Sequence, residues 1–129
     1  MTNLHKNKLE NIKTITIGYA RVSSTDNRQE LGLSVQKEAL SFCDKLYIEK
    51  DSGGNQERKQ LDKALKMAKK YAQQGVKTNF VVYKLDRLTR KMLHLSAIIE
   101  DLTKNNIHLQ SIHENIETDS LTGKFFCLM

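Results

Sequence analysis

Segments with two different hydrophobic periodicities alternate along this 129-residue chain. Residues 14–17 read Thr-Ile-Thr-Ile, which is the β-branched alternation of a strand, and residues 79–84 hold a nearly continuous apolar run, as a central parallel strand does. Between them, apolar residues recur at helical spacing. Because strands and helices follow one another in turn, the sequence predicts an α/β protein, a three-layer βαβ domain with a mainly parallel central sheet.

The length of the chain suits one domain, which we place at residues 13–123. Residues 1–12 are polar and rich in lysine and asparagine, so we expect a flexible N-terminal arm there. The predicted strands cover residues 14–23, 46–48, 79–84 and 107–113, and the predicted helices cover residues 34–43, 58–75 and 95–102.

The formal net charge is +6 and the sequence pI is about 9.3, which favours an anionic partner, either nucleic acid or a membrane surface. Lysines at helical spacing after Arg58 are typical of a solvated face. Cys43 and Cys127 lie far apart, and the four histidines fall in separate segments, so we expect no metal site. No apolar run has membrane-spanning length, and the first residues lack the apolar core of a secretion signal, so we expect a cytoplasmic protein with no membrane partner.

The first candidate site lies at the end of the predicted strand 14–23. Tyr19, Arg21 and Ser23 alternate, so the three side chains leave an extended strand on the same side, and a hydroxyl stands beside a guanidinium. A polar run follows at residues 24–28, and open α/β sheets place their chemistry at such strand ends. The alternative is that Ser23 only organises a turn or caps a helix.

A second polar cluster comes directly after the predicted strand 79–84. If it is helical, Asp86 and Arg90 are neighbours at i, i+4, and Arg87 and Arg90 at i, i+3 face one anionic group together. The alternative is an ordinary helix start with an acidic residue in its first turn. Arg58, after a glycine loop, is the third arginine-bearing segment, and this coincidence favours a site.

A serine surrounded by arginines suits phosphoryl transfer. Attack on a phosphodiester places negative charge on the phosphoryl oxygens, which planar guanidinium groups neutralise. Asp86 either donates a proton to the leaving oxygen or holds an arginine in place. The sequence has no Gly-x-Ser-x-Gly elbow and no phosphate loop of the Walker type, and a dinucleotide fold would need three glycines where only Gly18 stands.

Four stretches together resemble the N-terminal catalytic domain of the serine site-specific recombinases, the resolvase and invertase family. The resemblance covers about residues 15–124. It is carried by Tyr19-Ala20-Arg21-Val22-Ser23, by Asp51-Ser52-Gly53 through Arg58, by Lys84-Leu85-Asp86-Arg87-Leu88-Thr89-Arg90, and by Glu117-Thr118-Asp119 with Gly123-Lys124.

The resemblance implies that Ser23 attacks the DNA backbone and forms a 5′-phosphoserine link, after which strands are exchanged and rejoined without a metal, ATP or a small-molecule cofactor. It implies DNA as a partner and self-association into dimers and tetramers in a full-length parent. The implied roles are phosphate binding and activation by Arg21, Arg58, Arg87 and Arg90, assistance by Asp86, and supporting positions for Tyr19, Gln36 and Ser52. Tyr19 is at least as well explained by core packing.

Two departures from the family pattern matter. Asn27 stands where the family commonly has glutamine, and the sequence then extends through a loop to Gly32. Residues 124–129 correspond to the start of the family's oligomerisation helix, so we expect a truncated helix there and a chain that does not find a specific DNA site on its own. The alternatives are a non-catalytic regulatory or oligomerisation module of the same fold and a nucleotide-binding enzyme.

Overall fold

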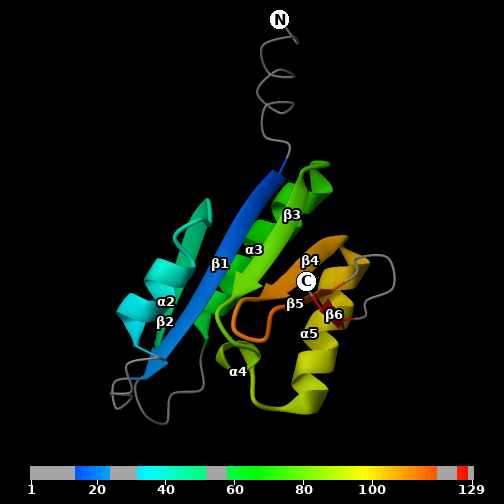
Figure 1. Ribbon diagram of the computed structural model, residues 1–129. Coiled ribbons are helices and arrows are strands. Elements are labelled where there is room, and N and C mark those ends of the chain that lie inside the picture. Colours follow the sequence, from blue (N-terminus) through cyan, green and yellow to red (C-terminus); the bar gives the residue numbers. More distant parts are fainter. Residues whose placement is uncertain (1–13, 24–31, 52–57, 119–124, 128–129) are drawn as a thin grey trace, which may run out of the picture.

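The computed structural model describes residues 14–23, 32–51, 58–118 and 125–127. Within these residues, a six-stranded sheet carries helices on both faces (Figure 1). The arm expected at residues 1–12 lies outside the described part of the chain. None of the described helices combines the length and the apolar character needed to cross a membrane.

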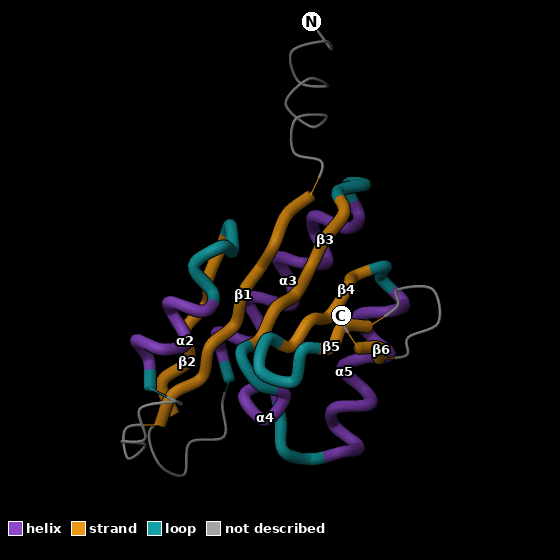
Figure 2. The backbone as a smooth tube through the Cα atoms, viewed as in Figure 1, coloured by secondary structure: helices purple, strands orange, loops and turns teal. Residues whose placement is uncertain are grey.

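The sheet has the strand order β2-β1-β3-β4-β5-β6 (Figure 2). The first four strands in this order are parallel, whereas β5 and β6 continue the sheet in antiparallel pairs. The predicted α/β fold with a mainly parallel sheet is therefore confirmed. The strands are β1 (Thr14–Ser23), β2 (Lys45–Asp51), β3 (Lys77–Val82), β4 (Ile107–Ser111), β5 (Ile116–Thr118) and β6 (Phe125–Cys127).

The helices occupy the two faces of the sheet as its connections require. The chain moves from β1 outward to β2, and then in the opposite direction to β3 and β4. Because crossovers between parallel strands are right-handed, this reversal places α2 (Leu33–Ala39) on one face and α3 (Lys59–Gln73) and α5 (Met92–Lys104) on the other (Figure 1). The single turn α4 (Leu85–Leu88) follows β3 directly.

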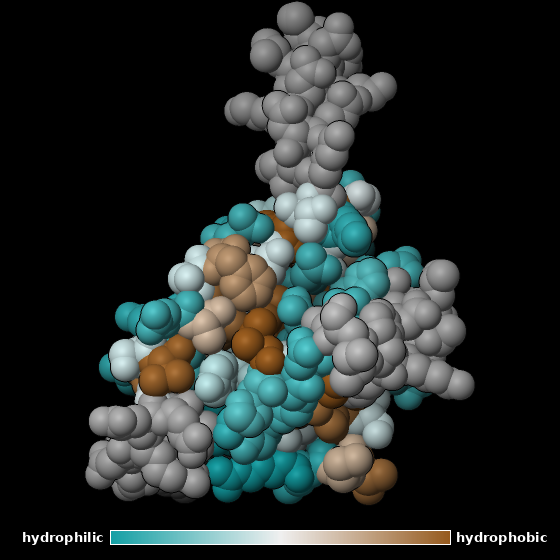
Figure 3. Space-filling model, in the orientation of Figure 1, coloured by the Kyte–Doolittle hydropathy of each residue, from teal (hydrophilic) through white to brown (hydrophobic). Residues whose placement is uncertain are grey.

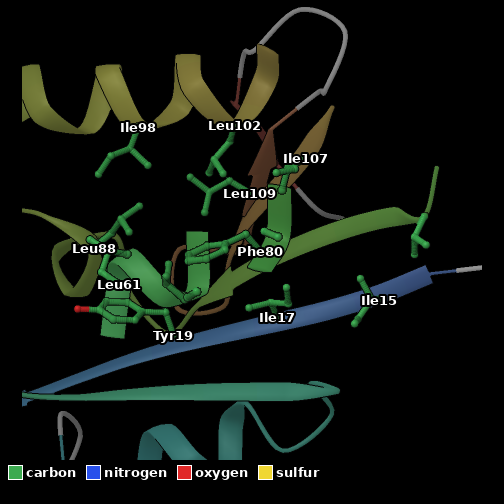
Figure 4. Packing of buried hydrophobic residues seen from close by; sticks show 14 residues of the cluster. Ile15, Ile17, Tyr19, Leu61, Phe80, Leu88, Ile98, Leu102, Ile107 and Leu109 are labelled. Atoms are coloured by element: carbon green, nitrogen blue, oxygen red, sulfur yellow. The ribbon is translucent and has the colours of Figure 1, made fainter. Parts of the chain in front are cut away.

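Two hydrophobic clusters hold the layers together. The larger one lies between the sheet and the helices α3 and α5, and the smaller one joins Ala20 and Val81 to Leu40 on the α2 side. Residues 80–82 of β3 are fully buried because both faces of this strand are covered, which explains their continuous apolar run. The larger cluster includes Ile15, Ile17, Tyr19, Leu61, Phe80, Leu88, Ile98, Leu102, Ile107 and Leu109 (Figure 4).

The α2 face of the sheet is covered less completely than the opposite face. In the space-filling view, apolar side chains gather over α2 and the middle of the sheet, and polar side chains surround them (Figure 3). Phe42, just after α2, is 55% exposed. This single helix therefore leaves apolar surface on its side of the sheet.

Both long helices end where the sequence predicts an end. Gly75, after α3, has a φ of 85°, and Asn106, after α5, has a φ of 58°. Glycine and asparagine tolerate this left-handed conformation better than other residues, so they end a helix at low cost.

The prediction of a helix start at residues 124–129 is wrong for the described residues of that segment. Phe125–Cys127 form β6, which pairs antiparallel with β5. Aromatic residues favour strands, and β5 would otherwise leave its hydrogen-bonding groups at the sheet edge. The predicted strand 107–113 also ends early, at Ser111, because the chain turns there into β5.

We predict that Gly18→Ala destabilises the domain. A Cβ atom at Gly18 would lie 2.8 Å from the Cys43 Sγ atom, a distance that Cβ atoms in proteins essentially never show, and at a tight 3.1 Å from the Leu46 Cδ1 atom. Overpacking of this kind lowers the free energy of unfolding by about 1–3 kcal/mol. Urea denaturation of Gly18→Ala, Cys43→Ala and the double variant measures the effect. Because Cys43→Ala removes the sulfur, the double variant should be more stable than the sum of the single effects; strict additivity would contradict the steric explanation.

Candidate active site at the carboxyl ends of the parallel strands

The candidate residues gather where the connections of the sheet change direction. β1 leads to α2 on one face, whereas β3 leads to α4 and α5 on the other. In open α/β sheets, ligands bind at the carboxyl ends of the strands at such a switch point. Arg21 and Ser23 end β1 there, and Asp86 and Arg87 belong to the turn α4 after β3.

Arg58 connects the start of α3 to this turn. Its Nη1 donates a hydrogen bond to the carbonyl oxygen of Leu88, and its Nη2 donates to the carbonyl oxygen of Arg87 at 2.7 Å. Its Nε and Nη2 atoms also donate to the hydroxyl oxygen of Tyr19, at 3.3 and 2.9 Å. The guanidinium carbon lies 5.4 Å from the centroid of the Tyr19 ring, within cation–π distance. Arg58 is thus fixed by five contacts to two other segments.

Arg21 and Arg87 also join two segments, because each guanidinium group donates to a main-chain carbonyl oxygen of the other segment. The Nη1 of Arg87 donates to the carbonyl oxygen of Arg21 at 3.1 Å, and the Nη2 of Arg21 donates to the carbonyl oxygen of Asp86 at 3.1 Å. The Nε of Arg87 also contacts the Asp86 carboxylate at 3.2 Å. The side chain of Gln36 is buried and donates to the same carbonyl of Arg21 at 3.1 Å. The structure therefore brings Arg21, Arg58 and Arg87 together, as expected from the sequence.

These contacts orient the arginines without removing their charge. Main-chain carbonyl oxygens accept most of the hydrogen bonds described above, and they are neutral. The carboxylate of Asp86 is 44% exposed, so water screens its attraction to Arg87. Within the described residues, the cluster holds three guanidinium groups and two carboxylates, those of Asp86 and Glu49. Among the described side chains of the cluster, cations therefore outnumber carboxylates by one.

Glu49 belongs to the site although it was not predicted from the sequence. Its Oε1 atom accepts hydrogen bonds from the Tyr19 hydroxyl at 3.3 Å and from the backbone N–H groups of Gln60 and Leu61 at 3.1 Å each. It thereby caps the N-terminus of α3, which has no side-chain cap of its own. Two features of the sequence could have indicated this role. Glu49 is an acidic residue inside a half-buried strand, and the helix that begins after Arg58 has no capping residue of its own.

Tyr19 combines core packing with a polar contact at the site. Its side chain is fully buried in the larger hydrophobic cluster, and its hydroxyl points away from the aliphatic side chains (Figure 4). That hydroxyl bridges Arg58 and Glu49. Burial raises the pKa of Tyr19 to about 12, although Arg58 acts in the opposite direction. The phenol is therefore neutral at physiological pH, and Tyr19 both packs in the core and contacts Arg58.

Arg90 differs from Arg87 in its exposure and in its backbone. Helix α4 ends at Leu88, and Thr89 is extended, with φ −167° and ψ 154°. Arg87 is 2% exposed, whereas Arg90 is exposed. The expected arrangement of these two arginines on one helix face is therefore absent. The Thr89 hydroxyl oxygen accepts a hydrogen bond from the Lys91 N–H at 3.2 Å, at the residue that caps α5.

The side chain of Ser23 and all of Ser52 lie outside the described part of the structure. The backbone of Ser23 ends β1 and pairs with Asp51 at the end of β2. The described residues contain no group of three or more histidine, cysteine, aspartate or glutamate side chains that could hold a metal ion.

The sequence family "Resolvase, N terminal domain" matches residues 16–129. The chain belongs to the resolvase N-terminal domain family. This confirms the resemblance to the catalytic domains of serine recombinases.

Named proteins show the same relationship. The resolvase domain is 38% identical to the DNA-invertase hin of Salmonella typhimurium, over 86% of this chain and 54% of the relative. It is 37% identical to the serine recombinase gin of Escherichia phage Mu, over 85% and 53% of the two chains. For the transposon Tn917 resolvase of Enterococcus faecalis the identity is 35%, over 84% and 55%.

A solved structure agrees with the fold. The N-terminal catalytic domain of TP901-1 integrase superposes with a TM-score of 0.56 and 28% identity, over 86% of this chain and 85% of that one. The resolvase domain spans about half the length of the curated relatives it matches.

We predict that Tyr19 makes stability fall at high pH. The folded protein keeps the Tyr19 proton up to a pKa of about 12, whereas the unfolded chain releases it near the ordinary value of 10.0. The folded state binds more protons in this window, so the free energy of unfolding declines as pH rises from about 10 to 12. Urea denaturation across this range should show a smaller decline for Tyr19→Phe than for the unmodified chain; parallel curves would contradict the assignment.

Proposed function

We propose that this resolvase domain is the catalytic part of a serine site-specific DNA recombinase. The Ser23 hydroxyl loses its proton as its oxygen forms a bond to the phosphorus of a DNA phosphodiester. The bond from phosphorus to the 3′ oxygen breaks, and that oxygen takes up a proton, so no proton is gained or lost overall. The products are a 5′-phosphoserine ester and a free 3′ hydroxyl. After exchange of strands, a 3′ hydroxyl attacks the ester, which releases Ser23 and restores the DNA backbone. The ester retains the bond energy, so rejoining requires no ATP, and in our proposal the guanidinium groups supply the charge stabilisation that a metal would otherwise give.

The convergence of Arg21, Arg58 and Arg87 at the end of the strand that carries Ser23 is the observation that supports this proposal. Attack on a phosphodiester increases the negative charge on its two non-bridging oxygens. Preorganised guanidinium groups stabilise this charge, and a single well-placed arginine accelerates phosphoryl transfer about a thousandfold or more. Positive charge nearby also favours the serine alkoxide.

The arginines divide into inner and outer positions. Arg21 and Arg58 are partly exposed and contact the phosphate in our proposal, and the exposed Arg90 approaches it from the surface. Arg87 is nearly buried, so it contributes its charge from inside and positions the carbonyl of Arg21. This arrangement surrounds a phosphate with cations from three segments of the chain.

Four other residues support these arginines. The contacts of Asp86 with Arg87 and Arg21 favour a role as an anchor over a role as a proton donor. Tyr19 and Gln36 act as positioning residues, because they contact Arg58 and the carbonyl of Arg21. Ser52 remains a proposed contact in the loop before Arg58.

DNA and further copies of the protein are the partners in this proposal. The relatives are named as DNA-invertases, a serine recombinase and a transposon resolvase. Cutting two duplexes and joining exchanged ends requires four active serines, so we propose dimers and tetramers in a full-length parent. We propose the cytoplasm as the location, where such a protein meets DNA.

We predict that Ser23→Ala abolishes covalent attachment to DNA. The measurement uses a pool of nicked duplexes with randomised central base pairs, in which the cut strand dissociates and cannot be rejoined. The unmodified chain should give a product that survives detergent, and mass spectrometry after nuclease digestion should place the phosphate on Ser23. A covalent product that persists in Ser23→Ala would contradict the assignment. No covalent product from any duplex, with retained binding to a full-length relative, would favour a non-catalytic module.

We further predict that Arg90→Ala and Arg87→Ala differ in their effect on stability. Arg90 is exposed, so Arg90→Ala should leave the free energy of unfolding nearly unchanged and reduce DNA cleavage at least tenfold. Arg87→Ala also removes a buried hydrogen bond to the Arg21 carbonyl, which costs about 1–3 kcal/mol. Urea denaturation and the covalent-product assay, performed on both variants, separate the two effects. Equal destabilisation by both variants would show that the inner and outer positions are not distinct.

A further inference from the structure

A basic hollow lies at the outer edge of the sheet, at the same end as the candidate site. It has a volume of about 580 Å³ and is open to solvent. Its wall is formed by the end of β2, the start of α2 and the start of α3 (Figure 1). The residues that line it are Leu33, Lys37, Ile48, Glu49, Lys50, Lys59 and Gln60.

Three lysines from three different elements give this hollow its charge. Lys37 comes from α2, Lys50 from β2 and Lys59 from the first turn of α3, and all three are exposed. Glu49 is the acidic residue among those that line the hollow, but it is 8% exposed. Its Oε1 atom already accepts three hydrogen bonds, from Tyr19 and from the start of α3. The accessible part of the wall is therefore basic.

The hollow is close to the proposed nucleophile. Lys50 pairs with Val22, the residue before Ser23, across the parallel strands β2 and β1. Since neighbouring strands are about 4.8 Å apart and residues advance about 3.3 Å along a strand, the Lys50 backbone lies within roughly 6 Å of the Ser23 backbone. Because Lys50 pairs with Val22, its side chain leaves the sheet on the face opposite to Arg21 and Ser23. The hollow therefore adjoins the site at the ends of the strands, around the edge of the sheet.

We propose that this basic hollow binds the DNA backbone beside the phosphate that Ser23 attacks. This inference rests on the proposed function. Lysine carries a compact charge on a flexible stem, which suits phosphate binding without base recognition. Leu33 and Ile48 add an apolar surface for the sugar. The lysines hold the flanking backbone in register, while the arginine cluster acts on the reacting phosphate.

The salt dependence of DNA binding tests the proposal. Each phosphate contact adds about 0.9 to the slope of log K against log salt concentration for duplex DNA. Fluorescence anisotropy with a labelled duplex, between about 50 and 200 mM salt, measures this slope. All proteins carry Ser23→Ala, so binding is read without cleavage. The triple variant Lys37→Gln, Lys50→Gln, Lys59→Gln should bind more weakly, with a slope reduced by about 2 to 3.

The matched control is the triple variant Lys63→Gln, Lys66→Gln, Lys70→Gln. It removes the same charge from exposed positions of α3 outside the hollow and should leave the slope nearly unchanged. Equal reductions of the slope in both triple variants would show that DNA binding depends only on net charge, and this result would overturn the proposal. An unchanged slope with increased self-association would also overturn it, because the lysines would then only protect the edge strand β2 from pairing.

A second measurement needs no lysine variant and is therefore independent of folding defects. Acetylation of lysines, read by mass spectrometry, should be reduced by duplex DNA at Lys37, Lys50 and Lys59 but not at the three control lysines. Protection by inorganic phosphate without protection by the duplex would indicate a small-anion site and overturn the proposal. Covalent attachment through Ser23 is assayed separately, so a failure of the hollow leaves the proposed cleavage reaction testable.

Discussion

The position of the Arg58 guanidinium is the constraint on which the site depends. This group precedes α3, yet it contacts the backbone of the turn after β3 and the phenol of Tyr19 on β1. Strands β1 and β3 are neighbours, and α3 packs across both, so the arrangement of the sheet and α3 already brings these segments together. The hydrogen bonds of Arg58 then fix the turn α4 relative to β1. A change in the packing of α3 would therefore alter the geometry of the whole arginine cluster.

The Asp86 carboxylate contacts Arg87, but neutral groups accept most of the described arginine hydrogen bonds. The cations are oriented mainly by neutral carbonyl oxygens, and these bonds cost less desolvation than a fully buried ion pair. Glu49 lies close to Arg58 but accepts its hydrogen bonds from Tyr19 and from the N-terminus of α3. The partial positive charge of a helix N-terminus stabilises this carboxylate, so the arginines are not needed for that purpose. The result is a stable local structure that still attracts an anion.

Sequence patterns predicted the parallel part of the fold because its physical signals are local. Phe80, Val81 and Val82 are apolar in succession since both faces of β3 are covered, and Gly75 marks the end of α3 through its left-handed backbone. Strands β5 and β6 were missed because three residues are too few to show a periodicity. Their pairing depends on an edge that exists only after the sheet has formed.

The candidate site could be predicted only in part, for the same reason. The arginine-bearing motifs named Arg21, Arg58 and Arg87, and the structure brings them together. The inward direction of Arg87 depends on where α4 ends, which helical spacing alone did not reveal. The role of Glu49 could not be predicted in this way, because it depends on a contact between β2 and the start of α3, which are separate in the sequence.

The extended backbone at Thr89 has a consequence for how the domain responds to a ligand. A continuous helix would place Arg87 and Arg90 on the same face, one turn apart. Because the helical geometry ends between them, Arg87 is held by hydrogen bonds inside the domain while Arg90 lies at the surface. In the proposed reaction, one cation is preorganised and the other approaches the phosphate from the solvent side. Four consecutive residues, 87–90, thus present one buried cation and one exposed cation.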